Sequence, residues 1–253
     1  EPITFRSISN FTKKSDASTN PYDSDSIFNG CAVRSLCIGL CLYGKNNRDE
    51  LIHVAIRLCK LTHNSPMGFL GGVTTALFVA FSIEGLNMDR WGYELLEILK
   101  SNKVKKHIDK DSIEEMTDYL TYLKYWRKYL DIRFKDGKLL QHKSQKNLML
   151  RVKYYYEYFV RNTQTSIIGK TAYSACIISY DCLLDCDGKW EKLIFYASMI
   201  PGESNSISSI AGGLFGIQYG YSDTPKILLD NMEFSKELKN LGKKLYKKYG
   251  KNK

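Results

Sequence analysis

The segment MGFLGGVTTALFVAFSI, residues 67–83, carries no charged side chain and is apolar on nearly every face of a helix. It is the only transmembrane candidate in the sequence. However, threonines interrupt it, Glu84 follows it directly, and no second span comes after it. A helix of this kind is typical of the centre of a folded core. We therefore expect other helices to pack around residues 67–83, and we expect no membrane as a partner.

Helical periodicity continues on both sides of this segment. Residues 49–63 place Leu51, Ala55 and Leu58 on one face. Further helices are predicted over 88–100, 113–134, 146–162, 171–186, 189–200 and 207–216. Alternation suited to strands is scarce and there is no internal repeat, so the predicted fold class is all-α.

The sequence predicts three regions: a polar lead-in over 1–26, one helical domain over 27–249 and a basic tail over 250–253. The lead-in is rich in Ser, Thr, Asn and Asp, which favours irregular structure. Its first residues lack the apolar region of a signal peptide. Seven cysteines form no CxxC pair and show no zinc-ligand spacing, and most lie in apolar runs. These features predict reduced core thiols in an intracellular, most simply cytoplasmic, protein.

The formal net charge of +10 permits an acidic partner. Residues 236–253 hold eight lysines and one glutamate, while Phe234, Leu238, Leu241 and Leu245 recur at helical spacing. This pattern predicts a helix whose apolar stripe is docked and whose lysines face solvent. We therefore do not expect nucleic acid as the partner.

Two stretches offer candidate binding residues. In NGCAVR, Asn29 and Gly30 open a helix whose free N–H groups could hold an anion, or Asn29 could only cap that helix. In KLTHNSPMGFLGG, His63 ends one helix just before a break. For both stretches, the residues alone favour an ordinary structural role over a catalytic one.

The stretch PGESNS, residues 201–206, places several oxygen-bearing side chains along a turn before a helix of small residues. Glu203, Asn205 and Ser206 could point oxygens at one Mg²⁺ ion. Only Glu203 is anionic, however, so the residues alone favour a capped turn over a metal site.

Taken in order, these stretches resemble the ADP-ribosyl-acceptor hydrolase (ADP-ribosylglycohydrolase) family, especially ADP-ribosylarginine hydrolases and their inactive relatives. The resemblance is carried by NGCAVRSLCIGL, THNSPMGFLGGVTTALFVAF, SYDCLL and IAGGLFGIQYG, and it runs from residue 27 to residue 249. It implies a compact helical fold.

The resemblance also implies two Mg²⁺ ions, held between two acidic clusters, that orient the ribose of ADP-ribose and polarise a water. It implies that Glu203, Asn205 and Ser206 would bind metal. Asn29, Gly30 and His63 would lie near the ADP-ribose.

The sequence departs from this family pattern in three ways. The N-terminal helices and their acidic metal motif are absent before Ser26. Glu203 and Asn205 stand where active members carry aspartates, and Tyr173-Ser174 stands where a His-Asp pair is usual. A weakened or lost Mg²⁺ site follows, because each ion is neutralised by few carboxylates.

We therefore expect a degenerate, inactive ADP-ribosylhydrolase-like module that serves as a structural or interaction subunit, with residual ADP-ribose binding. The alternatives are a Mg²⁺-dependent ADP-ribosylarginine hydrolase and a basic nucleic-acid-associated protein. Without N-terminal helices, the apolar face of residues 67–83 should be exposed, so we expect another protein chain or subunit to cover it.

Overall fold

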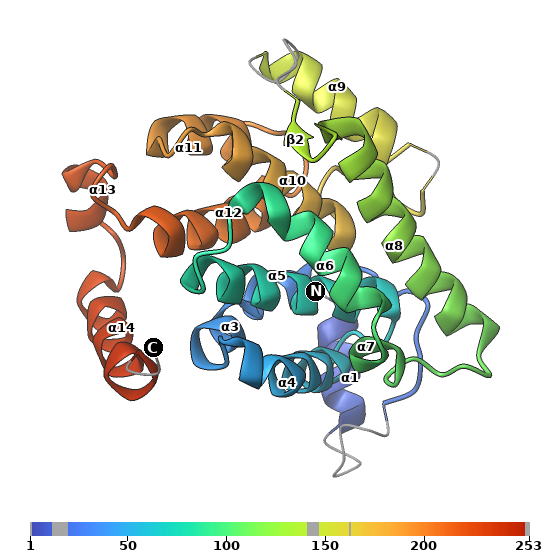
Figure 1. Ribbon diagram of the computed structural model, residues 1–253. Coiled ribbons are helices and arrows are strands. Elements are labelled where there is room, and N and C mark those ends of the chain that lie inside the picture. Colours follow the sequence, from blue (N-terminus) through green and yellow to red (C-terminus); the bar gives the residue numbers. More distant parts are fainter. Residues whose placement is uncertain (1, 12–19, 141–146, 162, 251–253) are drawn as a thin grey trace.

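The computed structural model describes residues 2–11, 20–140, 147–161 and 163–250, and their regular secondary structure is almost all helix, as predicted (Figure 1). The helices are α1 Pro2–Phe11, α2 Gly30–Arg34, α3 Leu36–Cys41, η2 Lys45–Asn47, α4 Arg48–Lys60, α5 Pro66–Ile83, η3 Met88–Arg90, α6 Trp91–Lys100, α7 Asn102–Lys105, α8 Ile113–Arg133, α9 Leu148–Phe159, α10 Ala172–Asp185, α11 Trp190–Ser198, α12 Ser204–Tyr219, α13 Lys226–Asp230 and α14 Ser235–Tyr249. The strands are β1 Phe134–Lys135 and β2 Lys138–Leu139. Except for Gly250, the predicted basic tail lies outside the described residues.

Helix α5 is the centre of the fold, as the sequence predicts. Ser65 caps it by accepting a hydrogen bond from Met67 N (3.1 Å), and Pro66 begins it. Helices α2, α3, α4, α8, α10 and α12 all pack against it. By length and composition α5 could cross a membrane, but 89% of the apolar window lies inside the fold.

The expected exposure of the α5 face is wrong. Every residue from Pro66 to Phe81 is buried, because neighbouring helices of this same chain surround α5. The burial of α5 removes our reason for expecting another protein chain to cover it. The partner chain itself stays a prediction.

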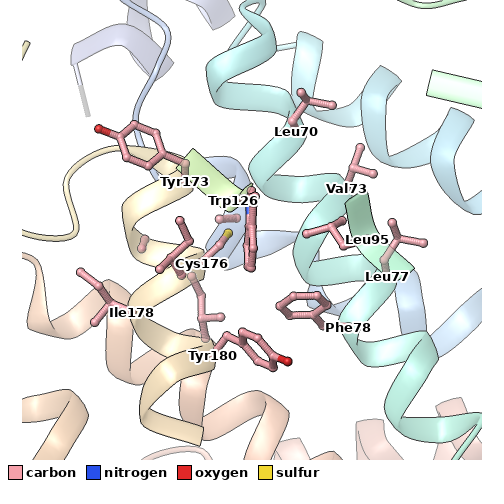
Figure 2. Packing of buried hydrophobic residues seen from close by; sticks show 14 of the residues in the cluster. Leu70, Val73, Leu77, Phe78, Leu95, Trp126, Tyr173, Cys176, Ile178 and Tyr180 are labelled. Carbon is pink, nitrogen blue, oxygen red and sulfur yellow. The ribbon is translucent and has the colours of Figure 1, made fainter. Parts of the chain in front are cut away.

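Aromatic rings fill the space between α5, α8 and α10 (Figure 2). Phe78 lies between Trp126 and Tyr180, with ring centroids 5.6 Å and 5.1 Å away. Such tilted and edge-on pairs are favoured over face-to-face stacking. This aromatic cluster fixes α10, and with it the loop that precedes α10, against the central helix.

A buried charge network joins α8, α9 and α10. Asp181 of α10 accepts hydrogen bonds from Arg133 and Arg151, with Arg151 Nη1 2.9 Å from Oδ2. Both arginines also reach Asp185, one turn further along α10. The two arginine side chains lower the pKa of Asp181 even though its burial acts in the opposite direction.

The lead-in is not the irregular segment that we expected, because residues 2–11 form helix α1. Ser7 is buried and its Oγ donates to the Thr62 carbonyl (3.2 Å), which ties α1 to the end of α4. The polar composition hid this helix because one of its docking side chains is itself polar.

The prediction of a docked apolar stripe on the C-terminal helix is also wrong. Phe234, Leu238 and Leu241 remain 63%, 50% and 59% exposed. The hydrogen bond from Tyr43 Oη to the Tyr249 carbonyl (2.8 Å) holds only the C-terminal end of α14 to the body. Leu245, the fourth residue of the predicted stripe, is partly buried, so the uncovered surface consists of the first three residues.

A short hairpin was not predicted. Strands β1 and β2 pair Phe134 with Leu139 across Asp136-Gly137, both of which have positive φ. Asp-Gly is a preferred pair for such two-residue turns.

Candidate functional site

The segments before α2 and α10 run side by side. Phe28 and Thr171 form an isolated antiparallel bridge, in which Asn29 N donates to the Lys170 carbonyl (3.1 Å) and Ala172 N donates to the Ile27 carbonyl (2.9 Å). The N-terminal ends of α2 and α10, which are more than a hundred residues apart in the sequence, therefore lie next to each other.

The Asn29 side chain makes a long-range hydrogen bond that the sequence did not indicate. It stands at the start of α2 but makes no side-chain cap hydrogen bond. Instead its Nδ2 donates to the Gly169 carbonyl at 2.7 Å, and its side chain is buried. Gly30, the first residue of α2, stays partly accessible beside this contact. Asn29 thus fixes the loop before α10. Its place near ADP-ribose stays a prediction.

The loop before α12 also contacts the segment before α10. Glu203 N donates to the Ile168 carbonyl at 2.9 Å. Gly202 has a φ of +110°, and a Cβ on it would lie 2.5 Å from that same carbonyl oxygen. Only glycine fits so close an approach. The backbone bend at Gly202 brings residues 201–206 against residues 167–170.

The side chain of Glu203 is paired with a cation. Lys170 Nζ lies 3.1 Å from Glu203 Oε1, and both side chains are about three-quarters buried, at 29% and 23% exposure. Lys170 also lies over the ring of Phe28, 5.1 Å from the centroid. Lys170 was not predicted as a site residue, although it lies only two residues before the first residue of α10.

The other two predicted metal ligands differ in their surroundings. Asn205 is exposed on the first turn of α12, whereas Ser206 is buried. Within the described residues no group of three or more His, Cys, Asp or Glu side chains could hold a metal ion. A single carboxylate that already neutralises a lysine is a poor ligand for Mg²⁺. The side chains present here do not fit a two-metal centre.

His63 lies in the interior, at 0% exposure. Its Nδ1 is 2.8 Å from Thr62 Oγ1, which also accepts a hydrogen bond from Arg34. A Cβ on Gly68 would lie 3.1 Å from His63 Cβ and 2.0 Å from the Ser26 carbonyl oxygen. His63 and Ser26 thus both lie against Gly68 at the start of α5, and the His63 side chain does not face solvent.

The start of α5 is held by a carboxylate that sequence reasoning missed. Asp118 Oδ2 accepts hydrogen bonds from Ser65 Oγ (2.6 Å) and Tyr22 Oη (2.9 Å). Burial and this carboxylate raise the pKa of Tyr22. Nothing in the local sequence marks Asp118, because the contact spans α8 and two loops.

Comparison with known proteins gives the family. The ADP-ribosylglycohydrolase family model matches residues 3–253. The chain belongs to the ADP-ribosylglycohydrolase family. A mimivirus protein of Acanthamoeba polyphaga mimivirus named as an ADP-ribosyl glycohydrolase is 34% identical over 228 residues, covering 87% of this chain and 44% of that protein.

A second relative, ADP-ribosylhydrolase ARH1 of Dictyostelium discoideum, is 28% identical over 246 residues, covering 89% of this chain and 62% of that protein. The chain thus spans less than two thirds of each of these relatives. A solved structure titled "ADP-ribosylglycohydrolase-related protein complex" has a TM-score of 0.61 at 16% identity, covering 98% of this chain and 69% of that chain. This last likeness supports the fold alone.

Proposed function

We propose that this member of the ADP-ribosylglycohydrolase family is a degenerate ADP-ribosylhydrolase-like module, which binds ADP-ribose but does not hydrolyse its glycosidic bond. The observation that carries the proposal is the ion pair between Lys170 and Glu203 (3.1 Å). Glu203 is the one carboxylate in residues 201–206, and a hydrolase would need it to bind metal or to take a proton from water. In this structure the lysine already neutralises that carboxylate.

Charge supports the retention of an anionic ligand. Helix α10 begins two residues after Lys170, and helix α12 begins one residue after Glu203, the partner of Lys170, so two positive helix ends flank this ion pair. Backbone N–H groups at helix starts favour phosphate oxygens. The diphosphate of ADP-ribose is therefore the part of the ligand that this arrangement suits best.

Calorimetric titration with ADP-ribose, in Mg²⁺ and in EDTA, tests the proposal. We expect the same affinity in both, because the binding charge comes from the protein. Incubation with an ADP-ribosylated arginine peptide should release no ADP-ribose in either condition. Lys170→Met should weaken binding, while Lys189→Met, which removes an exposed lysine paired with Asp223, should not.

Each other outcome decides against the proposal. Binding or release of ADP-ribose that requires Mg²⁺ would favour the alternative, a Mg²⁺-dependent ADP-ribosylarginine hydrolase. Absence of heat in both conditions would mean that the family's ligand site has been lost.

We also propose that the module serves as a subunit of an intracellular assembly with another protein chain. The uncovered side chains of Phe234, which directly precedes α14, and of Leu238 and Leu241 on α14 support a protein contact. Light scattering on the purified chain and on a Leu238→Gln/Leu241→Gln variant tests this. Exposed apolar stripes should promote association in the wild type only; two equally monomeric and soluble proteins would contradict the proposal.

A further inference from the structure

A cavity of about 410 Å³ lies between α1, α3 and α4, outside the site described above. Its walls are mostly apolar, and they include Ile8, Ile38, Leu58 and Leu61. Ile8 and Leu58, which both line this cavity, are 49% and 45% exposed. A cavity of this volume falls within the range of small-molecule sites.

Among the described residues that line this cavity, Arg34 is the only charged one. One of its terminal nitrogens, Nη2, donates to Cys31 Sγ (3.1 Å) and to Thr62 Oγ1. Within the described part of the chain, no carboxylate pairs with Arg34. The guanidinium is therefore held at a fixed place with Nε and Nη1 left as donors, although the surrounding wall is apolar.

We propose that this cavity binds a small apolar carboxylic acid, with the carboxylate on Arg34 and the hydrocarbon among Ile8, Ile38, Leu58 and Leu61. A planar guanidinium matches a carboxylate through two parallel hydrogen bonds. A single positive charge balances one negative charge. A phosphate dianion would leave an unbalanced charge beside apolar walls, which is costly. Charge and shape together thus select the acid.

Cys37 provides a direct readout, because its exposed thiol lies on the wall of the same cavity. Cys41, one turn further along α3, does not line the cavity and serves as an internal reference. The full chain is treated with a maleimide in the presence of octanoate or 1-octanol, and labelling at each cysteine is followed by mass spectrometry. We expect octanoate to slow labelling of Cys37 and to leave Cys41 unchanged, and octanol to protect much less.

Two variants separate charge from shape. Arg34→Met keeps an apolar stem and should raise the octanoate concentration needed for protection by about tenfold. Leu58→Glu, at an exposed position that tolerates a charge, should repel the acid. Arg127→Met on the far helix α8 should behave as wild type. Thermal unfolding monitored by circular dichroism confirms that each variant is folded.

The proposal is overturned if octanoate gives no protection of Cys37, if octanol protects equally, or if folded Arg34→Met and Leu58→Glu keep wild-type protection. Because none of these residues contacts Lys170 or Glu203 in the described structure, failure here leaves ADP-ribose binding untouched, and the reverse holds as well.

Discussion

Lys170 Nζ lies 3.1 Å from Glu203 Oε1, in the loop where the family resemblance places a metal. The lysine comes from the segment before α10 and the glutamate from the segment before α12, so the pair closes the site across two helix starts. A divalent ion would have to displace an ammonium that is also packed over Phe28. The charge balance of the site is therefore already met by the protein.

The first prediction concerns metal affinity. The wild-type chain should bind Mn²⁺, used as a paramagnetic substitute for Mg²⁺, no more tightly than about 1 mM, because one paired carboxylate is a weak ligand set. The double variant Lys170→Met/Asn205→Asp removes the ammonium and adds a carboxylate, so it should bind at least about tenfold more tightly. Electron paramagnetic resonance of free Mn²⁺ measures both.

Lys189→Met is the control for this prediction. It removes a lysine whose pairing with Asp223 (3.5 Å) is exposed and lies outside the site, so metal binding should not change. Micromolar Mn²⁺ binding by the wild type would contradict the interpretation of Lys170 as the resident cation.

The second prediction concerns the buried network. Asp181→Asn should lower the free energy of unfolding by about 3–5 kcal/mol, because the two buried charges of Arg133 and Arg151 would then share Asp185 as their single carboxylate. Urea denaturation measures the loss. Glu157→Gln breaks the exposed pair with Arg161 and should cost no more than about 0.5 kcal/mol. Equal effects of the two substitutions would show that the network is not electrostatically coupled.

The sequence predicted the helices well where a face is uniformly apolar or strictly periodic. Residues 67–83 and 171–186 were placed to within a few residues of α5 and α10, because burial dominates both segments. Helix α1 was missed, since its docking side chain is a serine. The undocked stripe of α14 was missed because periodicity indicates which face is apolar but not whether a neighbour covers it.

The contacts among the candidate loops could be anticipated from the resemblance, whereas the surroundings of the individual side chains could not. The loops around Asn29, Gly30 and Glu203 do meet, as the resemblance implied. The roles of Asn29, His63 and Lys170 depend on contacts across long sequence separations, which no local pattern encodes. A buried His63 and a paired Glu203 could therefore be found only from the fold.

The third prediction concerns pH. Partial burial, with Lys106, His53 and Lys60 nearby, lowers the pKa of His107 to about 4. The unfolded chain takes up this proton near pH 6.5, so it binds more protons than the folded chain between pH 6.5 and 4. Stability from His107 is therefore complete above pH 6.5 and is lost as the pH falls toward 4.

Because His107 is partly accessible, the loss should be only about 1 kcal/mol after solvent screening is taken into account. Urea denaturation at pH 7.0, 6.0 and 5.0 measures it. His107→Gln keeps a polar side chain without a proton to gain and should flatten this part of the profile. A variant whose stability falls as steeply as that of the wild type would assign the pH dependence to other groups.

The last prediction uses two helical glycines to test how tightly the site is built. A Cβ on Gly68 would lie 2.0 Å from the Ser26 carbonyl oxygen, which is backbone and cannot rotate away. Gly68→Ala should therefore destabilise the fold by about 2 kcal/mol. It should also weaken ADP-ribose binding, because Ser26 leads directly into the segment that ends at Asn29.

Gly216→Ala is the matched change in α12, where a Cβ meets nothing within 4 Å. It should stabilise the protein by about 0.5–1 kcal/mol, because alanine loses less conformational entropy in a helix, and it should leave ligand binding unchanged. Thermal unfolding and ADP-ribose calorimetry on both variants give the comparison. If Gly68→Ala lost stability but kept full affinity, the contact between α5 and Ser26 would hold the fold together without positioning the ligand site, and ADP-ribose would have to bind away from Asn29.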